Sequence, residues 1–411
     1  MEITNICMTT TSSDSPAAIA GRTDKQTACW GGVFAISLCV FVLVSSEFMP
    51  VSLLTPIAGE LRVSEGMVGQ GISISGVLAV LTSLSIASLS KGMDRKTLLL
   101  ILTLLMGISG AVVGLGQTYL TFMFGRALIG VVIGGFWSMS AAMAMRLVPA
   151  DQVSKALAIF NGGNALATVL AAPLGSLLGA TIGWRAAFLS LLPVAVIALV
   201  WQWMALPSMP AEASPSSSRK VFNLLKSRRV AYGMAGCGAF FMGQFTLFTY
   251  LRPFLEAVTQ VSASTLSVLL LAMGLAGFLG TAIISVLLKR GLYPPLIAIP
   301  VLMSVIAIAL IPLGCWLAPV SVLLCLWGLM ATATPVGWWS WLAQAVPNDA
   351  EKGGGLMVAV IQFAIACGST IGGLMLDSSG YQLTWMTSAI LLWLSAWLTF
   401  LAYRAQASSC V

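Results

Sequence analysis

Two charged residues of the chain lie inside stretches that are otherwise apolar. Glu47 lies in the sequence SSEFMPVSLLTP, three residues before Pro50, and Arg126 lies seven residues after Tyr119. A charged side chain at the centre of a bilayer costs about 3 kcal/mol, so each of the two needs a partner or a water-filled cavity. A carboxyl group in such a place can gain and lose a proton as its surroundings change. The chemistry indicated is proton exchange.

The two charges are predicted to lie at the same depth. Glu47 is eight residues before Thr55, near the predicted end of the first span, and Arg126 is seven residues after the start of the fourth span. At about 1.5 Å per residue, both lie roughly 10–12 Å below the outer surface. They are therefore expected to meet. Two roles remain open: Glu47 exchanges its proton during a transport cycle, or it only holds Arg126 in a static ion pair.

The composition indicates the elements that position these charges. Hydrophobic residues make up 58% of the 411 residues and charged residues 8%, against roughly 25% charged in a soluble domain. Apolar stretches of about 20 residues recur, the length that spans a bilayer. The predicted fold is an all-α membrane protein of twelve transmembrane helices in two pseudo-symmetric six-helix halves. The predicted spans are 30–56, 67–90, 97–116, 119–145, 155–179, 185–206, 230–254, 263–288, 293–315, 320–346, 353–376 and 381–403.

Several classes of function are disfavoured by residues that the sequence lacks. There is no histidine, which removes the usual general base and zinc ligand, so an enzyme is not expected. The eight cysteines are scattered without a CxxC pair, so no metal and no cofactor is predicted. There is no GxxxxGK[ST] phosphate loop, so energy must come from a gradient. The net charge of +7 is explained by membrane topology rather than by nucleic acid.

The basic residues predict the orientation of the spans. With both termini in the cytoplasm, only Arg62, Arg185 and Arg252 fall on the opposite side. The cytoplasmic side then receives sixteen basic residues, as the positive-inside rule requires: Arg22, Lys25, Lys91, Arg95, Lys96, Arg146, Lys155, Arg219, Lys220, Lys226, Arg228, Arg229, Lys289, Arg290, Lys352 and Arg404.

The chain divides near its midpoint at a Pro/Ser-rich stretch that precedes a basic segment. VPADQVSK after the fourth span resembles VPNDAEKG after the tenth, and Pro50 and Pro253 take matching places in EFMP and YLRP. Such repetition predicts parallel halves with substrate bound between them near the midplane. The predicted domains are a disordered cytoplasmic tail (1–29), an N-terminal six-helix bundle (30–206), a cytoplasmic linker (207–229), a C-terminal six-helix bundle (230–404) and a second tail (405–411).

Two motifs resemble those of the major facilitator superfamily, and more narrowly of its drug and metabolite proton antiporters. The fourth span resembles RxxxGxxxG, with Arg126, Gly130 and Gly134, and this resemblance implies proton coupling at the arginine. The fifth span resembles the antiporter motif, which implies export, although Ala172 replaces the glycine before proline. The loop SLSKGMDRKTL keeps little of the superfamily's GxLADRxGRR. Positions expected to serve helix packing or gating are Pro50, Gly130, Gly134, Pro173, Gly175 and Gly179.

Further stretches resemble the bacterial purine ribonucleoside efflux pumps, among them residues 47–56, 134–140, 243–245, 335–338 and 358–362. The resemblance implies a protein of the bacterial inner membrane, and a monomer is expected. It implies proton-coupled efflux of purine ribonucleosides such as inosine, adenosine and guanosine. The alternative is efflux of sugars or small drugs by the same antiport, and an alternative from another class is a non-transporting membrane sensor.

A nucleoside needs aromatic faces for its base and hydrogen-bonding groups for the base edge and ribose. Polar and aromatic residues within the spans supply candidates for these contacts. Trp339 and Trp341 are expected instead to face lipid or the interface. The candidate substrate residues are Phe136, Trp137, Asn161, Asn164, Gln244, Tyr250, Trp338 and Gln362.

Overall fold

The computed structural model describes residues 28–90, 92–210, 223–346 and 350–407, and all regular elements within them are helices. Most of the predicted tails, and the middle of the predicted linker, lie outside these residues. The N-terminal half consists of α1 (Trp30–Leu61), α2 (Glu65–Leu89), α3 (Arg95–Leu115), α4 (Tyr119–Trp137), α5 (Ser140–Arg146), a 3-10 turn η2 (Ala150–Gln152), α6 (Val153–Thr181), α7 (Trp184–Leu189) and α8 (Leu191–Ala205).

The C-terminal half follows the same plan. Its last helix contains a break at Gly380, whose φ of 77° is in the left-handed region that glycine tolerates, so α15 crosses twice. The elements are the 3-10 turn η3 (Asn223–Lys226), α10 (Arg228–Phe248), α11 (Leu251–Ala257), α12 (Ala263–Leu288), α13 (Tyr293–Leu313), α14 (Leu317–Ala345) and α15 (Ala350–Ala407).

The prediction of twelve crossings in two halves is confirmed. Ten helical stretches among the described residues are long and apolar enough to span a membrane. The last of these stretches is two crossings joined at Gly380, and the glycine-rich α10 adds the twelfth. Three predicted spans are interrupted, near Ser138, Ser190 and Thr249, where α4, α7 and α10 end. Such breaks are tolerated in lipid only where the freed backbone groups find partners within the protein.

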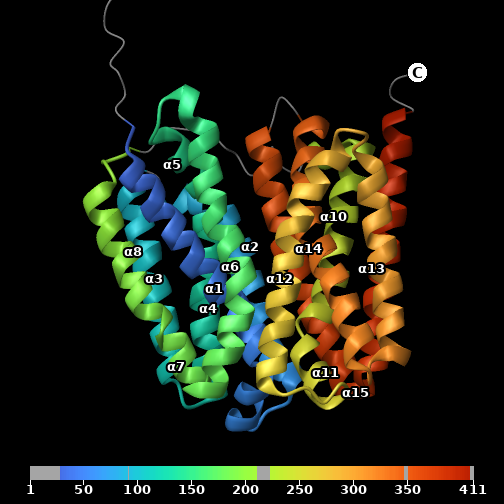
Figure 1. The fold of residues 1–411 in the computed structure, drawn as a ribbon. Coiled ribbons are helices and arrows are strands. Elements are labelled where there is room, and N and C mark those ends of the chain that lie inside the picture. Colours follow the sequence, from blue (N-terminus) through green and yellow to red (C-terminus); the bar gives the residue numbers. More distant parts are fainter. Residues whose placement is uncertain (1–27, 91, 211–222, 347–349, 408–411) are drawn as a thin grey trace, which may run out of the picture.

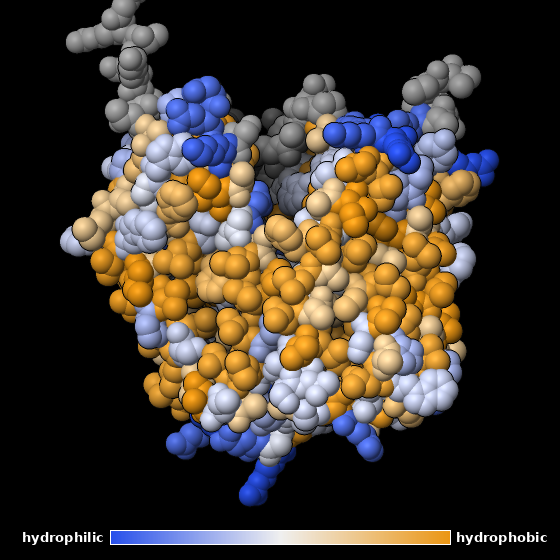
Figure 2. Space-filling view, viewed as in Figure 1, coloured by the Kyte–Doolittle hydropathy of each residue, from blue (hydrophilic) through white to orange (hydrophobic). Residues whose placement is uncertain are grey.

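The two halves stand side by side in Figure 1, with the start of α1 and the end of α15 at the upper end. We call this the termini end, and we call the lower end, where α1 meets α2 and α11 meets α12, the closed end. Across the interface α2 packs against α15 and α6 against α12. On the face shown in Figure 2, a broad apolar belt lies between polar ends. Large side chains such as Leu120, 79% exposed, therefore face lipid rather than water.

The first helix is longer than predicted and continues to Leu61 through Pro50 and Pro56. A proline inside a helix lacks the N–H that would bind the carbonyl four residues earlier. In α1 this frees the carbonyls of Ser46 and Ser52. Both serines are buried, so each carbonyl needs a donor from another element.

Glycines allow two close helix contacts in the N-terminal half. A side chain at Gly130 or Gly134 of α4 would meet backbone atoms of Ser75 or Ala79 of α2. Gly175 lies in the same way against the Ser52 side chain of α1. Small residues at such contacts let helix backbones approach in a membrane, where van der Waals packing drives association.

Asp94 begins α3 at the termini end and joins it to the segment after α8. One carboxylate oxygen accepts hydrogen bonds from the backbone N–H groups of Lys96, at 2.8 Å, and Thr97, at 3.4 Å. The other accepts from the Ser208 hydroxyl and from the N–H of Met209, the latter at 2.8 Å. The hydrogen bond from Ser208, together with those from the backbone, holds the pKa of Asp94 below its usual value.

We expect Asp94→Ala to lower stability by about 1 kcal/mol at pH 7, the usual cost of losing a helix N-cap. Because the folded pKa is depressed, this stability is present above the unfolded pKa of about 3.9 and is lost as pH falls through the folded pKa. Unfolding in detergent at several pH values measures it. Asp94→Asn keeps a capping oxygen and is the control. An equal deficit for Asp94→Ala at pH 7 and at acid pH would contradict the assignment.

Candidate substrate and proton site

Arg126 is almost fully buried, 1% exposed, and donates to four groups in two neighbouring helices. Its Nη1 donates to the carbonyl of Ser46 at 2.9 Å, and its Nη2 donates to the carbonyl of Glu47 at 3.4 Å. Its Nε donates to the carbonyl of Gly71 at 3.2 Å, and Nη2 also donates to the Ser75 hydroxyl at 3.1 Å. The guanidinium therefore joins α4 to both α1 and α2.

The Ser46 contact has a direct cause in the sequence. Pro50 removes the N–H that would bind the carbonyl of Ser46 within the helix, and Arg126 supplies a donor in its place. The expected meeting of Glu47 and Arg126 thus occurs, but through the backbone. Among the described residues no ion pair within 4.0 Å joins the two side chains. A static side-chain ion pair is not what the structure contains.

The Glu47 carboxylate instead meets the other half of the molecule. Its Oε1 accepts a hydrogen bond from Nε2 of Gln362 in α15 at 3.3 Å. Glu47 is 8% exposed and Gln362 7% exposed, so the contact lies largely out of solvent. The only indication of this contact in the sequence was the cost of burying the Gln362 amide without a partner.

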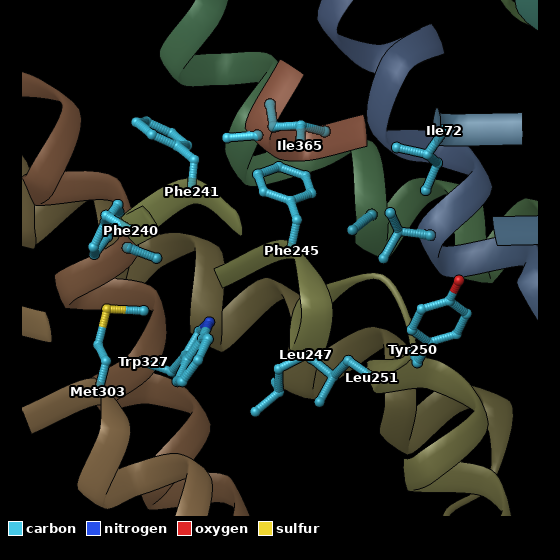
Figure 3. Close-up of a cluster of buried hydrophobic side chains, with 14 of the residues drawn as sticks. Ile72, Phe240, Phe241, Phe245, Leu247, Tyr250, Leu251, Met303, Trp327 and Ile365 are labelled. Carbon is cyan, nitrogen blue, oxygen red and sulfur yellow. The ribbon is translucent and has the colours of Figure 1, made fainter. Parts of the chain in front are cut away.

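An aromatic cluster lies beside this contact and also joins the halves. The ring of Phe48 in α1 stacks on Phe245 of α10, with centroids 6.1 Å apart, and meets the edge of Phe248 at 6.4 Å. In Figure 3, Phe245 lies next to Ile365 of α15. Sequence reasoning did not select Phe48, Phe245 and Phe248 as site residues. The feature of the sequence that could have identified these three residues was their position near Glu47 and Gln244.

Three of the predicted aromatic substrate residues are packed against neighbouring helices, and Tyr250 lies in the interface between the halves. Phe136, Tyr250 and Trp338 are fully buried. The Tyr250 hydroxyl donates to the carbonyl of Ser369 at 2.6 Å and lies against Gly69 of α2. Trp338 meets the edge of Trp341 with centroids 5.7 Å apart. None of these three rings is open to a ligand in this conformation.

The remaining candidates have partly accessible side chains. Trp137 is half-buried against the edge of Phe160, with centroids 6.0 Å apart. Asn161 is exposed, and its amide donates to the carbonyl of Leu157 in its own helix at 2.9 Å. Asn164 is half-buried. Gln244 is also half-buried, but its Oε1 is buried and accepts no hydrogen bond within the described part of the chain.

The exposed fractions of two tryptophans and one arginine show where their side chains lie. Trp339 is 44% exposed, as expected for an outer position. The expectation that Trp341 faces lipid is wrong: it is fully buried, and its Nε1 donates to the Tyr293 hydroxyl at 3.1 Å. Arg252, near the end of the predicted span 230–254, lies in α11 and is 6% exposed. It is held in the interface by hydrogen bonds.

Polar contacts close the lower end of the interface between the halves. Asp377 of α15 accepts hydrogen bonds from the Ser64 hydroxyl at 2.6 Å and from the Gly66 N–H at 3.3 Å, at the start of α2. The Thr370 hydroxyl lies 2.8 Å from the hydroxyl of Ser73. At the termini end, by contrast, the surface is hollowed between the halves (Figure 2). The described residues therefore form an arrangement sealed at the closed end.

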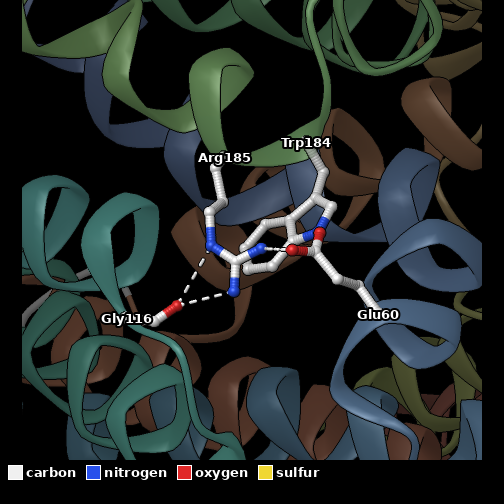
Figure 4. A network of polar contacts seen from close by, with 4 residues as sticks. All are labelled: Glu60, Gly116, Trp184 and Arg185. Atoms are coloured by element: carbon white, nitrogen blue, oxygen red, sulfur yellow. Dashed lines mark hydrogen bonds and ion pairs between the residues drawn. The ribbon is translucent and has the colours of Figure 1, made fainter.

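A second polar network joins elements of the N-terminal half at the closed end (Figure 4). The Glu60 carboxylate accepts from Nε1 of Trp184 and is paired with Arg185. Arg185 donates to the carbonyl of Gly116 at 2.9 and 3.2 Å and lies over the Trp184 ring, 4.3 Å from its centroid. This network connects the end of α1 to α7 and to the α3–α4 turn.

Twelve apolar crossings in two halves, with a buried carboxylate and amide facing each other between them, define a membrane transporter rather than an enzyme. A sequence profile described as Major Facilitator Superfamily matches residues 36–357, and the chain belongs to that superfamily.

Similar proteins match most of the chain. It is 58% identical over 391 residues to "Transcription regulatory protein OpdE" of Pseudomonas aeruginosa, covering 94% of this chain and 97% of that protein. It is 38% identical over 367 residues to "Purine ribonucleoside efflux pump NepI" of Salmonella enteritidis, covering 89% and 92%. The fold resembles a bacterial homologue of the lysosomal transporter Spinster, solved inward-facing and unoccupied, with a TM-score of 0.75, 13% identity and coverage of 94% and 98%.

Proposed function

We propose that the protein exports purine ribonucleosides across the bacterial inner membrane in exchange for protons, as a monomer with both termini in the cytoplasm. The observation that carries the proposal is the buried Glu47 carboxylate, which contacts Gln362 across the two halves. The 38% identity to a purine ribonucleoside efflux pump supports the substrate class. The basic residues predicted at the termini end support the orientation.

The contact between Glu47 and Gln362 can respond to a proton. An ionised carboxylate only accepts hydrogen bonds, whereas a protonated carboxyl group also donates one. Protonation of Glu47 therefore changes which hydrogen bonds it can form with the Gln362 amide, and so changes the interaction between the halves. Arg126 donates to the backbone carbonyls of Ser46 and Glu47 in α1, and we propose that it positions Glu47 rather than exchanging its own proton.

For the substrate, the structure changes which residues we propose. Phe48 and Phe248 are half-buried beside the Glu47 site and offer ring faces for a purine once the halves separate. The Gln244 Oε1, buried without a donor, can accept an N–H from the base. Asn161 and Asn164 are proposed to contact the ribose. Phe136, Tyr250 and Trp338 are proposed to support the site through packing.

We expect Glu47→Gln to abolish nucleoside accumulation driven by a pH gradient while preserving exchange of labelled for unlabelled nucleoside at equal pH. Glutamine has the shape of the protonated acid but cannot release a proton. Inverted vesicles with an imposed gradient and radiolabelled inosine provide the measurement. Glu60→Gln, an acid at the closed end and away from Gln362, is the control. Undiminished gradient-driven uptake by Glu47→Gln would rule out its proton role.

Two other functions are separated by related measurements. Efflux of a sugar or a small drug predicts vesicle uptake of that compound but no nucleoside accumulation in the medium on expression. A regulatory role is favoured by the 58% identical relative named a transcription regulatory protein. It predicts no transport in vesicles but altered transcription when the gene is deleted, with the phenotype retained by Glu47→Gln.

A further inference from the structure

The second proline of α1 creates a contact between the two halves. Pro56 has no N–H to offer the carbonyl of Ser52, and Ser52 is 1% exposed. Nη1 of Arg252, in α11 of the other half, donates to this carbonyl. The same guanidinium donates through Nε to Glu256 at 2.9 Å and forms an ion pair with it through Nη2 at 2.7 Å. Glu256 thereby orients the guanidinium toward α1.

The two prolines of α1 thus have matching chemistry but different consequences. At Pro50 the freed carbonyl of Ser46 is bound by Arg126, and both belong to the N-terminal half. At Pro56 the freed carbonyl is bound by Arg252 from the C-terminal half. Only the second contact must break if the halves separate at this end. A buried carbonyl without any donor is costly in lipid, so the contact opposes that separation until water can enter.

The other hydrogen bonds between the halves reinforce this interpretation. Those made by described residues lie at the level of the Glu47 contact or nearer the closed end, including Asp377 with Ser64 and Thr370 with Ser73. Among these cross-half contacts only Arg252 brings a full positive charge to a carbonyl that its own helix cannot satisfy. Hydrogen bonds that involve a charged donor are about twice as strong as neutral ones.

We propose that Pro56, the Ser52 carbonyl and Arg252 form a latch, here called the proline latch, that holds the closed end shut. In the alternate state Arg252 leaves the carbonyl and water entering the path solvates it. The latch makes Arg252 a gating residue of the transport cycle. It rests on the transporter fold and is independent of which substrate is carried and of proton coupling.

The decisive variant is Pro56→Ala, because alanine supplies the missing N–H and competes with Arg252 for the Ser52 carbonyl. We expect the population open at the closed end to rise about tenfold, the effect of losing one charge-assisted hydrogen bond. Spin labels at Gln117 and Ser379, exposed positions of the two halves at this end, report it as a longer distance in pulsed electron resonance. The labelled protein carries serine in place of its native cysteines.

Three further variants make the test specific. Arg252→Ala, or Arg252→Lys if the alanine protein fails to fold, should give the same shift. The double variant with Pro56→Ala should shift no further than either single variant, since both remove one contact. Pro312→Ala, a proline inside α13, controls for adding an N–H to a helix and should leave the distance unchanged.

Three results would overturn the latch. One is a distance distribution that stays the same in Pro56→Ala and in the Arg252 variants. Another is a shift in Pro56→Ala alone, which would mean that straightening α1 is responsible. The third is additive shifts in the double variant, which would mean that the two residues act separately. Loss of nucleoside transport with the expected distance shifts would challenge only the proposed substrate.

Discussion

An Arg126→Ala protein should be about 3 kcal/mol or more less stable than the unmodified protein, because each buried acceptor that is left without a donor costs about 1–3 kcal/mol. The reason is the number of acceptors that would lose their donor. Arg126 donates to the carbonyls of Ser46, Glu47 and Gly71 and to the hydroxyl of Ser75. The Ser46 carbonyl is the most affected, because Pro50 offers it no N–H. Thermal unfolding in detergent and the yield of folded protein measure the loss.

A second-site change tests this explanation. Adding Pro50→Ala to Arg126→Ala returns an N–H to the Ser46 carbonyl, and should recover about 1 kcal/mol, the net value of one backbone hydrogen bond. Arg126→Lys should be intermediate, since one ammonium group cannot reach all four acceptors. If Arg126→Ala costs less than about 0.5 kcal/mol, the size of a neutral surface change, the network does not stabilise the fold. Lack of rescue by Pro50→Ala would mean that the stabilising effect of Arg126 does not depend on the carbonyl that Pro50 frees.

The second large effect is expected at the contact between α4 and α2. A methyl group at Gly134 would fall against the backbone of Ala79, which cannot move aside as a side chain can. Gly134→Ala should therefore destabilise the protein by about 1–3 kcal/mol, as overpacking does. Unfolding in detergent measures the change. Gly162 of α6 has no atom within 4 Å of the same added methyl group, so Gly162→Ala is the matched control.

The control should change stability in the opposite direction. Alanine is favoured over glycine in a helix by about 0.8–1 kcal/mol, and at Gly162 nothing opposes that gain. The same preference acts at Gly134, so the difference between the two variants isolates the steric term. Equal effects in both proteins would contradict the assignment of Gly134 to close helix packing.

The pattern of apolar residues predicted the spans well, and it failed where a helix is interrupted. The break near Ser138 divides one predicted span into α4 and α5, and α1 extends past its predicted end. Hydropathy measures how apolar a segment is and not the path of its backbone, so it contains no signal for a kink or an extension. Pro50 and Pro56 predict that two hydrogen bonds of the helix are missing. They do not predict that α1 continues past them, because its continuation depends on donors from other helices.

The candidate site was predicted in part. Glu47 and Arg126 were expected to be neighbours from their depth, and they are. Their depth in the membrane could not predict whether the Arg126 guanidinium would donate to the Glu47 carboxylate or to the Glu47 backbone carbonyl. Trp341 was misplaced for a related reason: a residue near a span end is expected to be exposed until the neighbouring helix that covers it is known.

By itself the sequence determined that this is a twelve-helix membrane protein, because span length and hydropathy are properties of continuous segments. It also determined that one acid and one base would be buried at similar depth, and that α1 would contain two carbonyls without helical donors. Only the tertiary structure decided which groups meet them. Gln362 reaches Glu47 from 315 positions away, and Arg252 reaches Ser52 from 200. Such pairings depend on the rotation and tilt of each helix in the bundle, which packing against neighbouring helices sets.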